Sequence, residues 1–348
     1  MRLEAIANPT LARSIGLPVL ALVATFVVGG MLAMLAGANP LLTFGLILKG
    51  AAGSKFALLE TLNRATPLIF TGLAVAVAFR ARLWNIGAEA QLYAGALVTI
   101  LIGTKLALPG VVLIPLMGIG ALVAGGLVLL GPVLLKTRLG VDEVVTTLLL
   151  NFIMLLVISM LLEGPLKDPM GMGWPKSEAI PRDARLPRLV EGLRLHWGFG
   201  IAILSAIVVW VIQTRTTLGY EIRAVGLNAA AARFAGIPVG KVMIKTALLS
   251  GGLAALAGFS EVAGLRGTLT LDLSPGFGYT GIVVAMLALL NPLGVVVSAI
   301  FVAGIFVGAD GMSRAAEVPT YIADILLATA LLFMVLAILL TKFRVLRG

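Results

Sequence analysis

The chain has 348 residues, of which 60% are hydrophobic and 12% are charged, and its formal net charge is +10. A soluble domain carries about 25% charged residues, so this composition excludes an ordinary soluble protein and indicates an all-α polytopic membrane protein. The apolar runs are continuous rather than alternating, which argues against a β-barrel. The chain has no cysteine and therefore no disulfide or thiolate metal site.

We interpret ten successive apolar runs as membrane-spanning helices, because about 20 apolar residues are needed to cross a bilayer. No small-residue cleavage site follows the first run, so we expect a retained helix rather than a signal peptide. The run at 279–290 is too short to cross fully unless its ends are irregular. The predicted spans are 16–36, 66–79, 86–102, 111–135, 144–162, 199–212, 242–263, 279–290, 294–307 and 321–340.

These spans form a single transmembrane domain over residues 1–348. Within it, 1–65 contains the first span and a semi-polar external segment, and 66–348 forms the core. The semi-polar segment carries four charged residues, which are Lys49, Lys55, Glu60 and Arg64.

Ten spans put both chain ends on the same side of the membrane. Basic residues of the short connections gather on that side, which the positive-inside rule identifies as cytoplasmic. They are Arg80, Arg82, Lys136, Arg138, the basic residues of 214–245 and those of the C-terminal tail. The proline-rich segment 163–197 is then an external loop with room for a small surface helix. Its own basic residues oppose this orientation, but the rule weakens in long loops.

Two proline-led runs are similar to each other. PGVV at 109–112 opens one predicted span and PLGVV at 292–296 opens another. The two spans run in opposite directions in this topology, which favours an inverted repeat of the kind common in transporters. A chance match between two apolar runs is the alternative.

The polar stretch 214–241 lies between two apolar runs and carries several basic residues against one acid, Glu221. Within it, 229–234 is a run of good helix formers, and Gly236 and Pro238 follow as stop signals. We expect a short helix on the cytoplasmic face, held between two spans. Such a helix is suited to docking against a cytosolic partner.

Several polar side chains fall inside or beside the predicted spans. Ionisable groups in such places usually face the bundle interior or a water-filled route. The candidates for a translocation pathway are Asn85, Glu89, Gln91, Asn151 and Glu261. The alternative for each is a structural hydrogen bond, and Asn151 in particular could fasten two helices together. Asp272, Asp310 and Glu317 are expected to be solvated loop residues.

No catalytic or metal-binding constellation stands out. The one histidine, His196, lies in a polar loop beside Trp197 and is expected to be an interfacial residue. There is no GxxxxGK[ST] phosphate-binding loop, so we expect no enzyme activity of the chain's own. ATP-driven work would require a separate subunit.

Three segments resemble the permease subunits of bacterial ABC importers, in the branch that serves simple sugars and nucleosides. They are WNIGAEAQLYAGAL at 84–97, GYEIRAVGLNAAAARFAGI at 219–237 and GFGYTGIVVAMLALLNPLGVV at 276–296. The resemblance extends from about residue 66 to the C-terminus. It implies a multi-pass protein of the bacterial cytoplasmic (inner) membrane that takes part in uptake.

The resemblance further implies that 214–241 contains the coupling segment that docks on the ATPase. Its residues are Gly219, Tyr220, Glu221, Arg223, Gly226, Asn228, Ala230, Ala231, Arg233, Phe234 and Gly236. The family pattern EAA-x3-G has glutamate where this chain has Ala230. The implied partners are two ABC ATPases, a second permease chain that is identical or paralogous, an external binding protein or lipoprotein and a small-molecule substrate. ATP is used by the partner, the chain binds no cofactor, and nucleic acid is not a partner.

The leading hypothesis is therefore an importer permease for nucleosides or related compounds. The same machine carrying a pentose or hexose is the near alternative, because substrate choice rests largely on the binding protein. A self-sufficient secondary transporter would need ion-coupling groups at the bilayer midplane, and few acids fall inside the predicted spans. A membrane-embedded enzyme lacks the necessary acid or histidine clusters.

Overall fold

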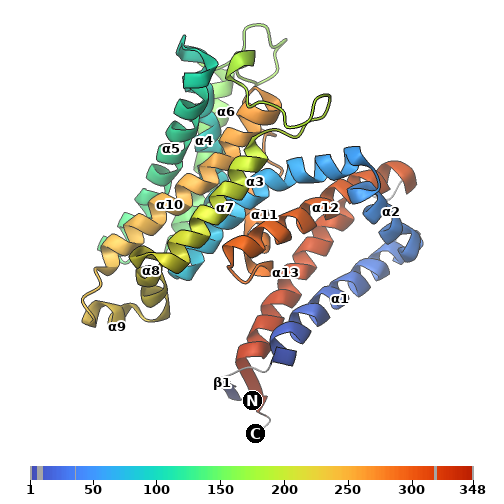
Figure 1. Cartoon of the computed structure of the whole chain (residues 1–348), viewed down its shortest axis with the longest axis vertical. Coiled ribbons are helices and arrows are strands. Elements are labelled where there is room, and N and C mark those ends of the chain that lie inside the picture. The colour runs from blue at the N-terminus through green and yellow to red at the C-terminus, as the bar shows by residue number, and fades with distance from the viewer. Residues whose placement is uncertain (1, 6–10, 36, 317–319, 347–348) are drawn as a thin grey trace. The chain divides into compact units, whose positions relative to one another are not determined.

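The computed structural model describes residues 2–5, 11–35, 37–316 and 320–346, and these residues are mostly helical. The helices are α1 (Leu11–Leu35), α2 (Pro40–Ala52), α3 (Lys55–Arg80), α4 (Ala88–Lys105), α5 (Gly110–Leu139), α6 (Glu143–Glu163), α7 (Gly198–Arg215), α8 (Thr217–Leu227), α9 (Ala229–Phe234), α10 (Val239–Ser260), α11 (Phe277–Leu287), α12 (Pro292–Ala316) and α13 (Tyr321–Lys342). A 3-10 turn (Arg182–Ala184), a π-helix (Glu261–Arg266) and two strands, β1 (Arg2–Ala5) and β2 (Phe343–Leu346), complete the set (Figure 1).

The chain forms two compact units. We call residues 1–61 with 301–348 the terminal unit and residues 62–300 the central unit. In the terminal unit, β1 pairs antiparallel with β2, with Arg2 opposite Leu346. Helix α1 packs along α13, and α2 meets α12 where Gly50 approaches Gly308. The two ends of the described chain therefore lie side by side within this unit.

Helix α10 forms the middle of the central unit and packs on α4 and α5 (Figure 1). A Cβ atom added at Gly251 would lie 2.2 Å from the Gly125 carbonyl oxygen of α5. One added at Gly258 would lie 1.9 Å from the Leu92 carbonyl oxygen of α4. Small residues allow such close backbone contact between helices in membranes. Every residue from Ser250 to Ser260 is buried, as expected for a helix surrounded by others.

Among the described residues, six helices are long and apolar enough to cross a membrane. They are α3, α5, α6, α7, α10 together with the π-helix, and α12. The count becomes seven if 19–35 and 40–52, which meet at a bend of 112°, form one span. Helices α4, α11 and α13 overlap three further predicted spans but are not among these six. The chain is thus a multi-pass helical protein, and the prediction of ten spans is not confirmed by this count.

The structure corrects the extent of the second predicted span. Residues 66–79 are the later part of a 26-residue helix that begins at Lys55. The semi-polar segment before it is also helical, since Lys49 lies in α2. The prediction followed the apolar run, but a helix continues through charged residues because lysine, glutamate and arginine are good helix formers.

The expected loop acids have three different outcomes. Asp310 lies in α12, which continues well beyond the predicted span 294–307. Asp272 is an exposed residue in the loop after the π-helix, as predicted. Glu317 lies outside the described residues. The loop 164–197 contains the expected small helical turn, at Arg182–Ala184.

Candidate functional site

The connector between α3 and α4, residues 81–87, lies at one edge of a buried polar network. It is not helical, and Arg82 adopts a positive φ of 53°. Ala81, Leu83, Asn85 and Gly87 are buried. Buried backbone N–H and C=O groups must find partners outside regular structure. Side chains of neighbouring helices supply many of them.

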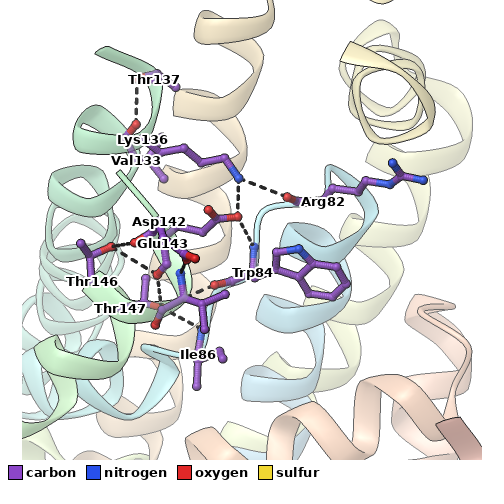
Figure 2. A network of polar contacts seen from close by, with 11 residues as sticks. Arg82, Trp84, Ile86, Val133, Lys136, Thr137, Asp142, Glu143, Thr146 and Thr147 are labelled. Carbon is purple, nitrogen blue, oxygen red and sulfur yellow. Dashed lines mark hydrogen bonds and ion pairs between the residues drawn. The ribbon is translucent and has the colours of Figure 1, made fainter. Parts of the chain in front are cut away.

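Helix α6 presents a polar stripe to this connector, because residues four apart in a helix share a face. Glu143 Oε1 accepts the Trp84 backbone N–H at 3.3 Å and also pairs with Lys136 Nζ of α5. Thr147 Oγ1 accepts the Ile86 N–H at 3.2 Å and donates to the Glu143 carbonyl oxygen at 2.6 Å. Figure 2 shows these side chains converging on the connector from the ends of α5 and α6.

Asn151, one turn further along α6, contacts two elements. Its Oδ1 accepts the Ala90 N–H in the first turn of α4 at 2.9 Å. Its Nδ2 donates to the Ile86 carbonyl oxygen at 2.9 Å and to Tyr279 Oη of α11 at 3.0 Å. Asn151 thus fastens α6 to α4 and α11, which is the structural alternative to its prediction as a pathway residue.

Asn85 and Gln91 form a reciprocal amide pair. Asn85 Nδ2 donates to Gln91 Oε1 at 2.9 Å, and Gln91 Nε2 donates back to Asn85 Oδ1 at 2.8 Å. Asn85 Nδ2 also donates to Ser250 Oγ of α10 at 3.0 Å, and that hydroxyl donates to the Ala74 carbonyl oxygen of α3 at 2.7 Å. The pair therefore joins the connector to α3, α4 and α10.

Glu89 and Tyr93 connect α4 to the beginning of α11. Glu89 Oε2 accepts the Gly278 backbone N–H at 2.7 Å. Tyr93 Oη donates to the Leu271 carbonyl oxygen at 2.5 Å and accepts the Ser274 N–H at 3.4 Å. The segment before α11 is held in this way against the first turns of α4. The structure thus brings four of the five pathway candidates into one network: Asn85, Glu89, Gln91 and Asn151.

The fifth candidate, Glu261, is the first residue of the π-helix that continues α10, and it is buried. π-helical turns occur frequently at functional sites. The loop 164–197 packs on this irregular segment: the N–H of Leu186 donates to the Ala263 carbonyl oxygen at 2.8 Å, and that of Ile180 donates to Gly267 at 2.9 Å.

His196 ends the same loop and is buried rather than interfacial. A Cβ atom added at Gly264 of the π-helix would lie 2.2 Å from the imidazole ring. His196 Nδ1 accepts the Gly198 N–H at 3.1 Å. Burial lowers the pKa of His196 to about 4, because desolvation disfavours its charged form. The prediction was wrong because position in a polar loop does not reveal tertiary packing.

The predicted coupling segment contains two helices. Asn228 lies between α8 and α9, and its Oδ1 accepts the N–H groups of Ala230 and Ala231 at 3.0 Å each. Helix α9 has the bounds that the sequence predicts, and Gly236 follows it at a φ of 84°. This left-handed conformation favours glycine and ends the helix.

Helix α8 is anchored to the ends of two long helices. A Cβ atom at Gly226 would lie 1.9 Å from the Arg80 carbonyl oxygen at the end of α3. One at Gly219 would lie 2.3 Å from the Ile212 carbonyl oxygen of α7. Arg223 donates to the Gln213 carbonyl oxygen of α7. Gly226 lies inside α8, where it allows this contact with α3.

The outer side of this segment is exposed and partly apolar. Phe234 is 97% exposed, and Tyr220 and Leu227 are also exposed. Ala230, Ala231 and Arg233 are exposed as well, whereas Ala232 is buried. A contiguous exposed apolar patch, unlike a single exposed apolar side chain, is typical of interaction surfaces. Glu221 is half-buried in α8.

Six partners that complete the network are not among the residues that the sequence singles out as pathway candidates. They are Lys136, Glu143, Thr147, Ser250, Tyr93 and Tyr279. The polar stripe Glu143, Thr147 and Asn151, spaced four apart in an apolar run, was the available signal. No cluster of three or more metal-ligand side chains is present in the part of the chain that the structure describes.

The chain is similar to known transport proteins over most of its length. The family described as "Branched-chain amino acid transport system / permease component" matches residues 57–339. The glucose ABC transporter permease protein TsgB13 of Haloferax volcanii is 36% identical over 340 residues, which cover 95% of this chain and 89% of that protein. The guanosine ABC transporter permease protein NupP of Bacillus subtilis is 34% identical over 323 residues, or 91% of each chain. The nucleoside ABC transporter permease protein NupB of Lactococcus lactis is 30% identical over 330 residues, which cover 92% of this chain and 90% of that protein.

Proposed function

This chain belongs to the family of permease components described for the branched-chain amino acid transport system, and from that premise we propose that it is the membrane-spanning subunit of an ATP-binding-cassette importer. The relatives named above are transport subunits rather than enzymes. The observation that carries the proposal is the structure of the coupling segment. The small exposed helix α9 directly follows α8, and α8 is anchored to the ends of α3 and α7.

The proposed substrate is a nucleoside or a related small polar solute. Two relatives are named for guanosine and for nucleosides, and these matches cover about nine tenths of each chain. A simple sugar is the second candidate, because the 36% identical relative is named for glucose. The buried polar network carries no feature that favours one over the other. An external binding protein would deliver the solute.

The proposed topology has ten spans with both chain ends in the cytoplasm. The basic short connections support this orientation through the positive-inside rule. The pairing of β1 with β2 supports a common side for the two ends. Residues 1–65 would contribute the first span and an external segment, and 66–348 the permease core. The whole chain would lie in the bacterial cytoplasmic membrane.

The proposed ATPase contact is made by α8 and α9. Phe234, Ala230 and Ala231 share one exposed face, because residues three and four apart are neighbours on a helix. An apolar face of this kind fits a groove on a cytosolic partner. The ATPase subunits would bind the ATP, and this chain would bind no cofactor. A second permease chain, identical or paralogous, would complete the membrane part.

The proposed pathway passes beside the beginnings of α4 and α11. Transporters commonly build substrate sites from the ends of short helices that meet inside the protein. Glu89 and Gly278 join two such ends here. We retain Asn85, Glu89, Gln91, Asn151 and Glu261 as pathway candidates, although each network member also has a structural hydrogen bond. We also propose that the similar runs at 109–112 and 292–296 belong to an inverted repeat.

The test is reconstitution in liposomes, with and without the cognate ATPase and binding protein. The complex should take up labelled guanosine, or glucose under the alternative, only when ATP is supplied. The chain alone should accumulate neither solute under a proton or sodium gradient. Gradient-driven accumulation by the chain alone would support a secondary transporter instead. Binding of each solute to the isolated binding protein identifies the substrate.

A further inference from the structure

The connector 81–87 lies between the coupling segment and the polar network. On one side, Gly226 of α8 packs on the Arg80 carbonyl group at the end of α3, immediately before the connector. On the other side, Asn85 and Ile86 are hydrogen-bonded to α10 and α6. Movement of α8 can be passed through the connector to α4 only if the connector keeps its shape.

The part of the connector nearest α8 ends α3: the N–H groups of Arg82 and Leu83 donate to the carbonyl oxygens of Phe79 and Ala78 at 3.0 and 3.1 Å. Arg82 adopts a positive φ of 53°, a conformation that residues other than glycine rarely take. Such a residue persists only when its surroundings hold it in place. The contacts of Asn85 and Ile86 begin three residues further on. The Arg82 carbonyl oxygen and the Trp84 N–H take no part in these bonds and are restrained by other groups.

Lys136 and Glu143 supply that restraint. Lys136 Nζ lies 3.5 Å from the Arg82 carbonyl oxygen and forms an ion pair with Glu143 Oε1. The same carboxylate oxygen accepts the Trp84 N–H at 3.3 Å. The Glu143 side chain is buried and the Lys136 side chain is about three-quarters buried. The pair therefore grips the backbone at both Arg82 and Trp84 (Figure 2).

The helices behind this pair are held in a fixed geometry. Lys136 lies in the last turn of α5 and Glu143 in the first turn of α6, positions that both helix dipoles favour. Gly140, at a φ of 71°, ends α5, and Asp142 caps α6 by accepting the Val144 N–H at 2.7 Å. The short turn fixes the separation of the two charged side chains. The restraint on the connector is thus built on two helices rather than on a loop.

We propose that the Lys136–Glu143 pair clamps the α3–α4 connector so that displacement of α8 by the ATPase reaches α4 and, through Glu89 and Gly278, α11. The inference rests on the proposed function. It makes Lys136 and Glu143 positioning residues for transport: neither needs to touch solute or ATPase. Loss of the pair should leave ATP hydrolysis intact while less solute is moved for each ATP consumed.

The test uses the assembled importer in proteoliposomes, with ATP hydrolysis and uptake of labelled guanosine or glucose measured on the same preparation. Glu143→Gln and Lys136→Met should lower solute uptake per ATP at least about fivefold, with ATPase co-purification unchanged. Lys136→Arg keeps the charge, so its solute uptake per ATP should stay within about twofold of the value for the unmodified chain. Arg138→Met removes a neighbouring exposed charge and is the matched control, with the same expected limit of about twofold.

Lys136→Met leaves a buried carboxylate without its cation, which can prevent folding. The double variant Lys136→Met/Glu143→Gln removes both charges and avoids that penalty, so it should assemble and still show the lowered ratio. If the assembled double variant moved as much solute per ATP as the unmodified chain, the proposed clamp would be wrong, and the proposed importer function would stand. A complex of the unmodified chain with no ATP-dependent uptake of either solute would overturn the proposed function and the clamp with it.

Discussion

The Glu89 carboxylate accepts the backbone N–H of Gly278 at 2.7 Å, although the two residues are 189 positions apart in the chain. Both residues lie in the first turn of a helix, α4 and α11 respectively. The N-terminal N–H groups of a helix have no partner within the helix, and a carboxylate is well suited to satisfy them. This contact therefore secures the beginning of α11, a helix too short to be placed by its own apolar length.

Gly278→Ala should separate the two helix ends. The added Cβ would lie 2.2 Å from the Glu89 nitrogen and 2.7 Å from the Ala88 carbonyl carbon, both backbone atoms that no rotamer change can move. We expect a loss of about 1–3 kcal/mol in stability, measured as a lower unfolding temperature in detergent. Gly131→Ala in α5 is the matched control, because its Cβ would meet nothing within 4 Å. Equal unfolding temperatures for the two variants would contradict the close contact.

Asn151→Leu should destabilise the protein by removing three hydrogen bonds at once. The Ala90 N–H and the Ile86 carbonyl group would each lose a buried partner. An unsatisfied buried group costs about 1–3 kcal/mol, so a clear fall in unfolding temperature is expected. Thr99→Val is the control: that buried hydroxyl donates to the Gly95 carbonyl group of its own helix. If Thr99→Val proved as damaging as Asn151→Leu, the fastening role would be wrong.

Local signals in the sequence predict several elements closely. The bounds of α9 follow from the helix-forming run at 229–234 and from Gly236. Asn228 caps the start of this helix, and asparagine is among the residues preferred at that position. The start of α12 follows from Pro292, which suits the first position of a helix. These features depend on residues a few positions apart, so they can be read without tertiary structure.

The network around the connector could be predicted only in part. Asn85, Glu89 and Gln91 were conspicuous because they are polar and lie beside apolar runs. Their partners were not, because Ser250 and Gly278 look like ordinary small residues in a membrane helix. In the sequence, Lys136 is one of the basic residues of a short connection between predicted spans, and Glu143 follows it seven positions later. Their grip on Arg82 and Trp84 depends on the packing of α5 and α6 against the connector, which no local pattern encodes.

The pH dependence of stability should contain a contribution from His196, the one histidine of the chain. Its pKa is lowered to about 4 in the folded protein by burial, against an ordinary value of about 6.5. Between these values the unfolded chain binds the proton and the folded chain does not, so stability falls as the pH drops from about 6.5 to about 4. The slope from this group approaches about 1.4 kcal/mol per pH unit.

Unfolding temperatures of the unmodified chain and of His196→Gln, measured from pH 4 to pH 8, test this contribution. Glutamine keeps an acceptor for the Gly198 N–H but has no ionisable group. The variant should therefore lose less stability on acidification than the unmodified chain. Parallel curves for the two proteins would mean that His196 titrates normally in the folded state.

Membrane sidedness can be tested with single cysteines in this cysteine-free chain. Glu178→Cys and Ala231→Cys put the thiol at exposed positions in the loop 164–197 and in α9. The neighbouring position 232 of α9 is unsuitable for a cysteine label, because Ala232 is buried and a thiol there would stay unlabelled on either side of the membrane. On intact cells, an impermeant thiol reagent should label position 178 and not 231, with the reverse in inside-out vesicles that lack the ATPase. Labelling of 231 on intact cells would reverse the proposed topology.

The ATPase contact should depend on the apolar face of α9 more than on its charge. Phe234 is 97% exposed, and Ala230 and Ala231 lie beside it on the same face. A buried aromatic anchor typically contributes about 2 kcal/mol or more to an interface, so Phe234→Ala should weaken ATPase binding about tenfold or more. Ala231→Glu would bring an unpaired charge into the same face, and we expect it to detach the ATPase or to uncouple hydrolysis from uptake. Arg233→Ala should do less, because an exposed ion pair contributes only about 0.2–1 kcal/mol.

The measurement is co-purification of the ATPase together with solute uptake by the reconstituted complex. All three α9 substitutions lie on an exposed surface, so the variants should insert and unfold like the unmodified chain, which a detergent melt verifies. Gly240→Ala is a control at the start of α10, where an added Cβ meets nothing within 4 Å. Full assembly and normal uptake with both Phe234→Ala and Ala231→Glu would remove α9 from the ATPase interface and leave α8 as the remaining contact.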